Sequence, residues 1–93
     1  MRKGFHIGET VICSIEITNQ NGQPVDPVTS MKITIKGPAT CGVENEDMIK
    51  DDVGKYHYDF NPSKKLEGDY EAIYTDKDGT RITIEKDCFH YIK

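Results

Sequence analysis

The stretch that decides the fold is Gly54-Lys55-Tyr56-His57-Tyr58-Asp59-Phe60. Side chains alternate between the two faces of an extended chain, so Tyr56, Tyr58 and Phe60 share one face and polar residues share the other. This alternation predicts a β-strand with one buried face. The core beneath it is expected to be rich in tyrosine, because the chain contains five Tyr, three Phe and no Trp.

A second stretch, Leu66-Glu67-Gly68-Asp69-Tyr70-Glu71-Ala72, follows shortly after the first. Tyr70 stands just after a glycine-containing turn at the start of a predicted strand, with Ala72 and Tyr74 on the same face. A β-sandwich keeps its tyrosine corner at such a position, with the hydroxyl bonded to backbone a few residues upstream. The two stretches together predict an immunoglobulin-like (Ig-like) β-sandwich.

Two more strands are predicted before these stretches, over Glu9–Thr18 and Val28–Lys36, because apolar and polar residues alternate in both. Asn19–Pro24 between them is turn chemistry, since Asn-Gly accepts a positive φ and proline stops strand pairing. Gly37-Pro38 ends the second strand. The predicted inward residues are Val11, Cys13, Ile15, Ile17, Met31, Ile33 and Ile35.

The C-terminal part is predicted to be a hairpin that turns at Asp76-Lys77-Asp78-Gly79. Its second strand carries two apolar pairs that are out of step, Ile82 and Ile84 followed by Phe89 and Tyr91. If Ile82 and Ile84 face the core, a β-bulge near Lys86 would reconcile the two phases.

The segment 39–52 shows no clear alternation and is predicted to be a long connection with one short edge strand. A brief strand is expected at Phe5–Ile7, and no segment shows a helical stripe. The prediction is a single all-β domain over residues 1–93, an Ig-like sandwich of about seven antiparallel strands.

Charge and composition bound the kinds of partner. With 12 Lys and Arg against 16 Asp and Glu, the formal net charge is −4, and the two signs are interspersed. Nucleic acid and anionic membranes are bound by concentrated basic faces, so neither is expected as a partner. No signal peptide and no apolar run of about 20 residues is seen. The odd number of cysteines, three, favours reduced thiols in the cytoplasm.

Two parts of the chain carry residue types that bind metals. Cys88 and His90 share a strand face, but no Cys-x-x-Cys or closely spaced His pair accompanies them, so no metal or cofactor is expected. Cys13 is interpreted as a small core residue. The acidic segment 44–52 is interpreted as solvated charge, and calcium binding there is left open. An EF-hand is excluded because the glycine in 76–79 comes two positions too early.

No catalytic residues are predicted. The serines Ser14, Ser30 and Ser63 lie in no Gly-x-Ser-x-Gly setting, and the glycines are scattered one per turn rather than gathered in a phosphate-binding loop. The chain is therefore interpreted as non-enzymatic. The residues expected to contact a partner protein are Ile12, which breaks the alternation of its strand, and the C-terminal aromatic pair Phe89 and Tyr91.

Several motifs together carry a resemblance to a known group of proteins. They are Gly8-Glu9-Thr10-Val11, Asn21-Gly22-Gln23-Pro24-Val25, Ile33-Thr34-Ile35, Gly37-Pro38, Gly54–Phe60, Gly68-Asp69-Tyr70 and the terminal Phe89. In these the chain resembles small Ig-like proteins encoded among the head and tail genes of tailed bacteriophages and prophages. It is more loosely similar to invasin-type bacterial Ig-like repeats and to macroglobulin-like domains.

The resemblance implies a structural or accessory component of the virion head, connector or tail. Its partners would be other virion subunits or copies of itself. It would be located in the host cytoplasm before assembly and in the virion afterwards. The alternative is a bacterial surface adhesion-type Ig-like module. One departure from antibody-type domains is clear: Ala72 stands where their second cysteine would face Cys13, so that inter-sheet disulfide cannot form.

Overall fold

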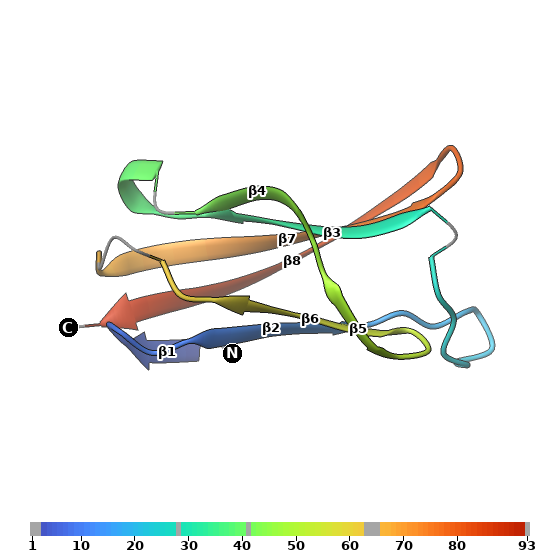
Figure 1. The fold of residues 1–93 in the computed structure, drawn as a ribbon, viewed down its shortest axis with the longest axis horizontal. Helices are drawn as coiled ribbons and strands as arrows, with labels where there is room; N and C mark the ends of the chain where they lie inside the picture. Colours follow the sequence, from blue (N-terminus) through green and yellow to red (C-terminus); the bar gives the residue numbers. More distant parts are fainter. Residues whose placement is uncertain (1–2, 28, 41, 63–65, 93) are drawn as a thin grey trace.

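The computed structural model describes residues 3–27, 29–40, 42–62 and 66–92, which form strands and one 3-10 turn and contain no α-helix (Figure 1). The 3-10 turn η1 covers Pro38–Thr40. The strands are β1 (Lys3–His6), β2 (Val11–Glu16), β3 (Ser30–Lys36), β4 (Val43–Asp47), β5 (Ile49–Asp52), β6 (Lys55–Phe60), β7 (Gly68–Asp78) and β8 (Arg81–Ile92).

The strands build two sheets that pack face to face (Figure 1). The larger sheet has the order β1-β8-β7-β3-β4 and the smaller one β2-β6-β5. The predicted all-β sandwich is therefore confirmed, with eight strands among the described residues rather than about seven. One pairing differs from the prediction of antiparallel strands, because β1 runs parallel to the end of β8, from Lys3 opposite Phe89 to His6 opposite Ile92.

The prediction of a single edge strand between 39 and 52 was wrong. The segment forms two strands, of which β4 pairs with β3 in the larger sheet and β5 pairs with β6 in the smaller sheet. The chain crosses between the sheets at Met48, whose side chain is buried and whose backbone N–H donates to the Met31 carbonyl at 3.1 Å. Most side chains of both strands are exposed, so the sequence carried little alternation to detect.

The core is formed by the inward faces that alternation predicted in β3 and β7. Met31, Ile33 and Ile35 are buried, and Ile33 has no exposed surface. Tyr70, Ala72 and Tyr74 are buried on the neighbouring strand. Next to them lies a cluster of aromatic rings whose centroids are 5.3 to 6.1 Å apart, which is the range for favourable edge-to-face and stacked pairs. The cluster consists of Phe60, Tyr70, Phe89 and Tyr91.

The tyrosine corner is confirmed. The hydroxyl of Tyr70 donates to the backbone carbonyl of Leu66 at 2.7 Å. Gly68 between them has a φ of 138°, a conformation that glycine adopts without a Cβ penalty. The ring of Tyr70 is thereby fixed above the other aromatic residues, and the turn that precedes β7 is held to the core.

The turn predicted at Asn19–Pro24 is also present. The side-chain oxygen of Asn19 accepts the N–H groups of Asn21 and Gln23 at 2.9 and 3.1 Å. Gly22 adopts a φ of 79° in the middle of the turn. These contacts satisfy the backbone locally, as turn-forming asparagines do.

The predicted phase of β8 was wrong in its first half. β8 pairs with β7 without a register shift, from Tyr91 opposite Gly68 to Arg81 opposite Asp78, so there is no bulge near Lys86. Phe89 and Tyr91 are 4% and 3% exposed, whereas Ile82 and Ile84 are 58% and 56% exposed. A strand without a bulge has one phase, and burial of the two large aromatic rings sets it.

Candidate interaction site at the open side of the sandwich

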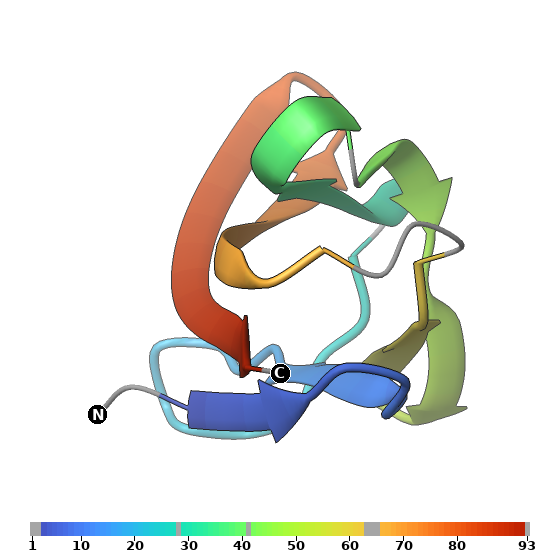
Figure 2. The ribbon, with the colours of Figure 1, turned by 90° about the vertical axis from the view of Figure 1, so that its left-hand side faces the viewer.

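The two long sides of the sandwich differ. On one side the chain passes from β4 to β5 and bridges the sheets, and on the other side the smaller sheet ends at β2 and the larger sheet at the short strand β1, next to β8 (Figure 2). Among the residues that the structure describes, β2 pairs only with β6. β1 covers β8 only from Phe89 to Ile92, so in the described part of the chain residues 81–86 have β7 as their only strand neighbour. Both strands therefore present unpaired backbone groups along one edge.

Two hollows lie between these edges. The first, of about 290 Å³, is lined largely by apolar residues of both sheets, including Val11, Cys13, Ala72 and Phe89. The second, of about 560 Å³, is lined mainly by polar residues, including Asp76, Arg81 and Glu85, with apolar side chains such as Met31 beside them. The first half of β8 turns Arg81, Thr83 and Glu85 toward the sandwich interior, and these side chains cannot join a closed apolar core.

Asp76 is a partly buried acidic group at this second hollow. Its Oδ1 atom is buried and has no hydrogen-bond partner among the described residues. Burial raises the pKa of Asp76 above its usual value, and the neighbouring charges of Asp78 and Glu85 raise it further. The hollow is thus an acidic environment with one cation, Arg81, at its rim.

Exposed isoleucines lie on both open strands. Ile12 on β2 is 64% exposed, which confirms that it breaks the inward pattern because it faces solvent. Ile82 and Ile84 stand on the outer face of β8. Sequence reasoning placed these two in the core, and the signal that could have corrected it was their phase relative to Phe89 and Tyr91.

The other two expected contact residues are placed elsewhere. Phe89 and Tyr91 lie in the aromatic core, and the Tyr91 hydroxyl donates to the Glu9 carbonyl at 2.8 Å. Their side chains are not on the surface of the folded chain, so we correct that expectation. Ile12 is the one predicted contact residue that the structure leaves accessible.

The acidic segment 44–52 is divided between the sheets. Asp47 on β4 pairs with Lys32 at 3.1 Å, and Asp51 on β5 contacts His57 Nδ1 at 2.7 Å. In the described part of the chain, no group of three His, Cys, Asp or Glu side chains is arranged to hold a metal ion. Cys88 and His90 lie on one face of β8, as expected, and Cys88 is exposed.

Asp26 is a polar group that the sequence did not single out. Its Oδ1 accepts the Gly54 N–H at 2.8 Å and the Tyr56 hydroxyl at 3.0 Å, and its Oδ2 accepts Lys50 Nζ at 2.7 Å. The backbone hydrogen bond from Gly54 and the Lys50 ammonium lower the pKa of Asp26. The contacts fasten the loop before β3 to the β5–β6 turn, which is a structural role.

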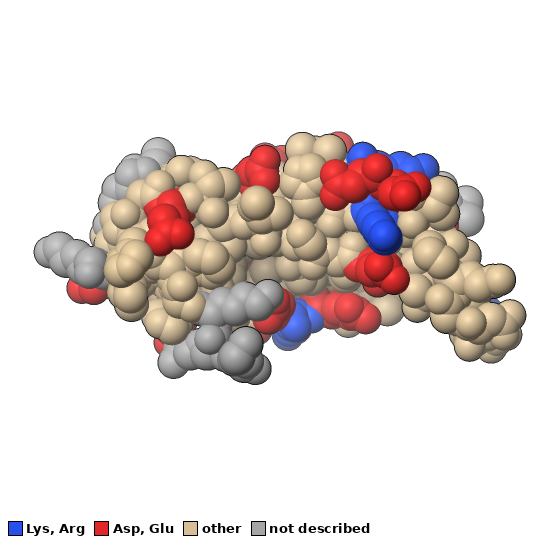
Figure 3. All heavy atoms as spheres, turned by 90° about the horizontal axis from the view of Figure 1, so that it is seen from below, with Lys and Arg blue, Asp and Glu red and all other residues tan. Residues whose placement is uncertain are grey.

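Charges of both signs are spread over the side of the smaller sheet. Lys and Arg side chains lie beside Asp and Glu side chains there, and the described residues form no continuous basic face in this view (Figure 3).

Comparison with family models, curated proteins and solved structures finds no match to this chain. Within the described ranges, no helix has the length and apolar character needed to cross a bilayer.

Proposed function

We propose that this chain is a non-enzymatic Ig-like interaction domain, and that it is a component of the head, connector or tail of a tailed phage or prophage virion. The sheet order supports the Ig-like part of the proposal. In a seven-strand Ig domain, one sheet contains the second, fifth and fourth strands in that order, and the other contains the seventh, sixth and third. Here β4 is an extra strand beside β3. When β4 is left out of the count, β2-β6-β5 and β8-β7-β3 have the same order as the two Ig sheets. The hydrogen bond from Tyr70 to Leu66 matches the tyrosine corner of such domains.

The observation that carries the interaction role is two edges without a strand neighbour among the described residues: β2, with exposed Ile12, and the first half of β8, with exposed Ile82 and Ile84. An open edge binds a partner by adding a strand to the sheet, and apolar side chains beside it add buried area. On β2 the contact residue we propose is Ile12. The virion role is supported by the resemblance to small Ig-like phage proteins.

The test is to follow the chain in the bacterium that encodes it. Phage production is induced, particles are purified on a density gradient, and the chain is quantified by mass spectrometry in particles and in washed cell envelopes. We expect a fixed number of copies per particle. Enrichment on the cell envelope, with none in particles, would replace the virion role by the adhesion-type alternative.

Two matched variants test the proposed contact. Ile12→Glu places a charge at the β2 edge and is expected to reduce incorporation into particles. Ile49→Glu places the same charge on β5, where Ile49 is 52% exposed, and is expected to be neutral. If the two variants are incorporated equally well, the β2 edge is not the contact.

A further inference from the structure

The open edge of β8 has a sequence that is complementary to itself. Residues 81–85 read Arg-Ile-Thr-Ile-Glu, with Arg81, Thr83 and Glu85 on the inner face and Ile82 and Ile84 on the outer face. We propose that this edge pairs antiparallel with the same edge of a second copy of the chain, with Thr83 opposite Thr83. The product is a two-fold symmetric dimer in which the larger sheets join into one continuous sheet.

The register decides which side chains meet. With Thr83 on the two-fold axis, Arg81 lies opposite Glu85 of the second copy, and the symmetry creates this ion pair twice. Ile82 lies opposite Ile84 of the second copy, again twice, on the outer face where both are more than half exposed. Opposite charges and apolar side chains directly across a strand pair stabilise it.

Neighbouring registers lose this match. Each side chain must stay on its face, so pairing can shift only in steps that keep the faces aligned. Centring the pair on Ile84 places Arg81 opposite Asp87, but it leaves Glu85 opposite Thr83 and brings Ile82 opposite Lys86. Centring it on Ile82 leaves Arg81 opposite Thr83 and brings Ile84 opposite Thr80. Only the register centred on Thr83 pairs all four charged and apolar residues.

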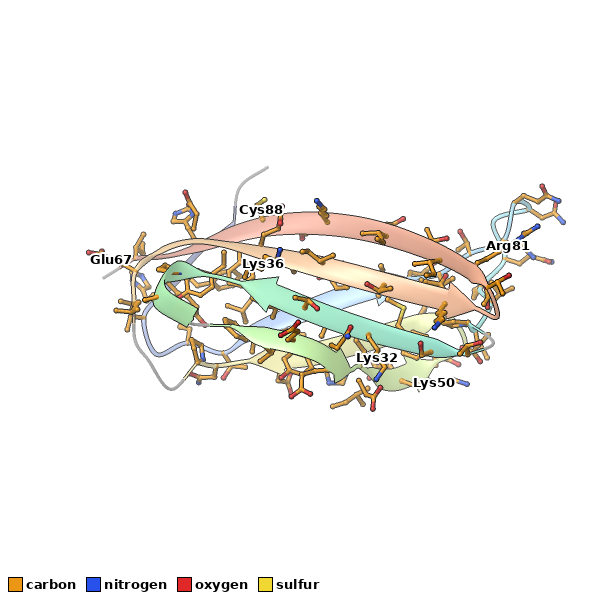
Figure 4. The ribbon with its side chains drawn as sticks, turned by 90° about the horizontal axis from the view of Figure 1, so that it is seen from above. Lys32, Lys36, Lys50, Glu67, Arg81 and Cys88 are labelled. Carbon is orange, nitrogen blue, oxygen red and sulfur yellow. The ribbon has the colours of Figure 1, made fainter. Side chains whose placement is uncertain are left out.

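The free length of β8 fits this pairing. β1 covers the strand only from Phe89 onward, so the five residues 81–85 lie within the edge that the described part of the chain leaves open. Figure 4 shows β8 along the border of the larger sheet, with Arg81 at its hairpin end and Cys88 farther along the strand. Inward-facing charges at an edge oppose indiscriminate strand addition. Arg81 and Glu85 therefore disfavour pairing with other strands, but they can pair with Glu85 and Arg81 of a second copy.

The inference does not depend on the virion role, because it concerns the purified chain alone. The experiment is sedimentation velocity and light scattering over a concentration series, at low salt because the ion pairs are exposed. Three samples are compared: the unmodified chain, Arg81→Glu and Glu85→Arg. We expect a monomer–dimer equilibrium for the unmodified chain. Each variant opposes like charges twice per dimer, so its dissociation constant should rise about tenfold.

Mixing the two variants provides the decisive sample. The Arg81→Glu chain carries two acidic side chains at these positions and the Glu85→Arg chain carries two basic ones, so both ion pairs re-form across the heterodimer. We expect the mixture to dimerise as the unmodified chain does, although each variant alone is weakened. Glu46→Lys on β4, at the opposite border of the same sheet, is the control and should leave the dimer unchanged.

Three results would overturn the proposal. They are an unmodified chain that stays monomeric at all concentrations, a dimer that survives both single variants, and a mixture that stays as weak as its components. If a charge variant does not fold, as judged by circular dichroism, a cross-link gives the same decision. Thr83→Cys, with Cys41 and Cys88 replaced by Ser, should form a disulfide-linked dimer on mild oxidation, and Glu46→Cys in that background should not. Absence of the cross-link in the Thr83→Cys variant would also reject the register.

Discussion

Tyr70 is the residue on which the prediction from sequence and the structure agree most closely. Its position after a glycine turn predicted a hydroxyl bonded to upstream backbone, and the structure has that bond, to Leu66 at 2.7 Å. The ring is almost completely buried, so the hydroxyl needs a hydrogen-bond acceptor, and the Leu66 carbonyl supplies one. The position could be predicted because the corner requires a local sequence pattern and no distant partner.

Tyr70→Phe should therefore lower the free energy of unfolding by about 1 kcal/mol, the usual net value of a buried hydrogen bond. The Leu66 carbonyl loses its donor while the ring packing is kept. Urea denaturation measures the change. Tyr58→Phe is the matched control, because Tyr58 is only half-buried, and no described residue hydrogen-bonds its hydroxyl. Equal midpoints for the two variants would contradict the role of the Tyr70 hydroxyl.

Asp76 gives a prediction in which the substitution raises the free energy of unfolding instead of lowering it. Burial and the charges of Asp78 and Glu85 raise its pKa above 3.8, so the folded chain binds the proton more tightly than the unfolded chain. This stabilisation is fully present below pH 3.8 and is lost as the pH rises through the folded pKa. At pH 7 the partly buried carboxylate costs stability, and Asp76→Asn removes that cost.

We expect Asp76→Asn to unfold at a higher urea concentration than the unmodified chain at pH 7, with the difference shrinking as the pH falls through the raised pKa of Asp76 and lost below pH 3.8. Glu44→Gln removes a carboxylate from an exposed position on β4 and should leave the unfolding midpoint at pH 7 unchanged. An Asp76→Asn variant that is less stable at pH 7 would mean that the carboxylate has a stabilising partner.

At the scale of elements, predictions succeeded where a strand has one buried and one solvated face. Alternation placed β2, β3, β6 and β7 on their correct faces because each lies against the core along its length. β4 and β5 were underestimated because exposed polar residues carry no period. β8 was misread because its first half lines the second hollow instead of the closed core, so that its inner face is polar and its outer face carries isoleucine. The open site depends on this hollow, which no local pattern encodes.

A pair of alanine variants tests the phases of β3 and β8. Ile33 has no exposed surface, so Ile33→Ala should cost about 2 to 5 kcal/mol through lost burial and the cavity left behind. Ile84 is 56% exposed, so Ile84→Ala should change stability by about 0.5 kcal/mol or less. Thermal or urea unfolding at low protein concentration keeps any dimer from contributing. A large loss for Ile84→Ala would restore the inward phase that the sequence alone suggested.

At the scale of the whole molecule, the two ends of the chain are joined by the parallel pairing of β1 with β8. That pairing closes the open side only at one end and leaves the rest of β8 for a second copy. Phe5 fastens it, since its ring meets the Phe89 ring edge-on with centroids 6.0 Å apart. The parallel pair could not be predicted from the sequence, because it links residues more than eighty positions apart.

Phe5→Ala should loosen this junction without unfolding the sandwich. Phe5 is only half-buried, so the loss should be about 1 to 2 kcal/mol, below the range for a fully buried phenylalanine. Hydrogen exchange can show that the loss of stability is confined to the β1–β8 junction, since local opening exposes only the amides of the affected unit. The amides of 89–92 should exchange faster, while Ile33 in the centre of the larger sheet stays protected. Unchanged exchange at 89–92 would show that β1 does not hold the end of β8, and the free edge would then extend along the whole strand.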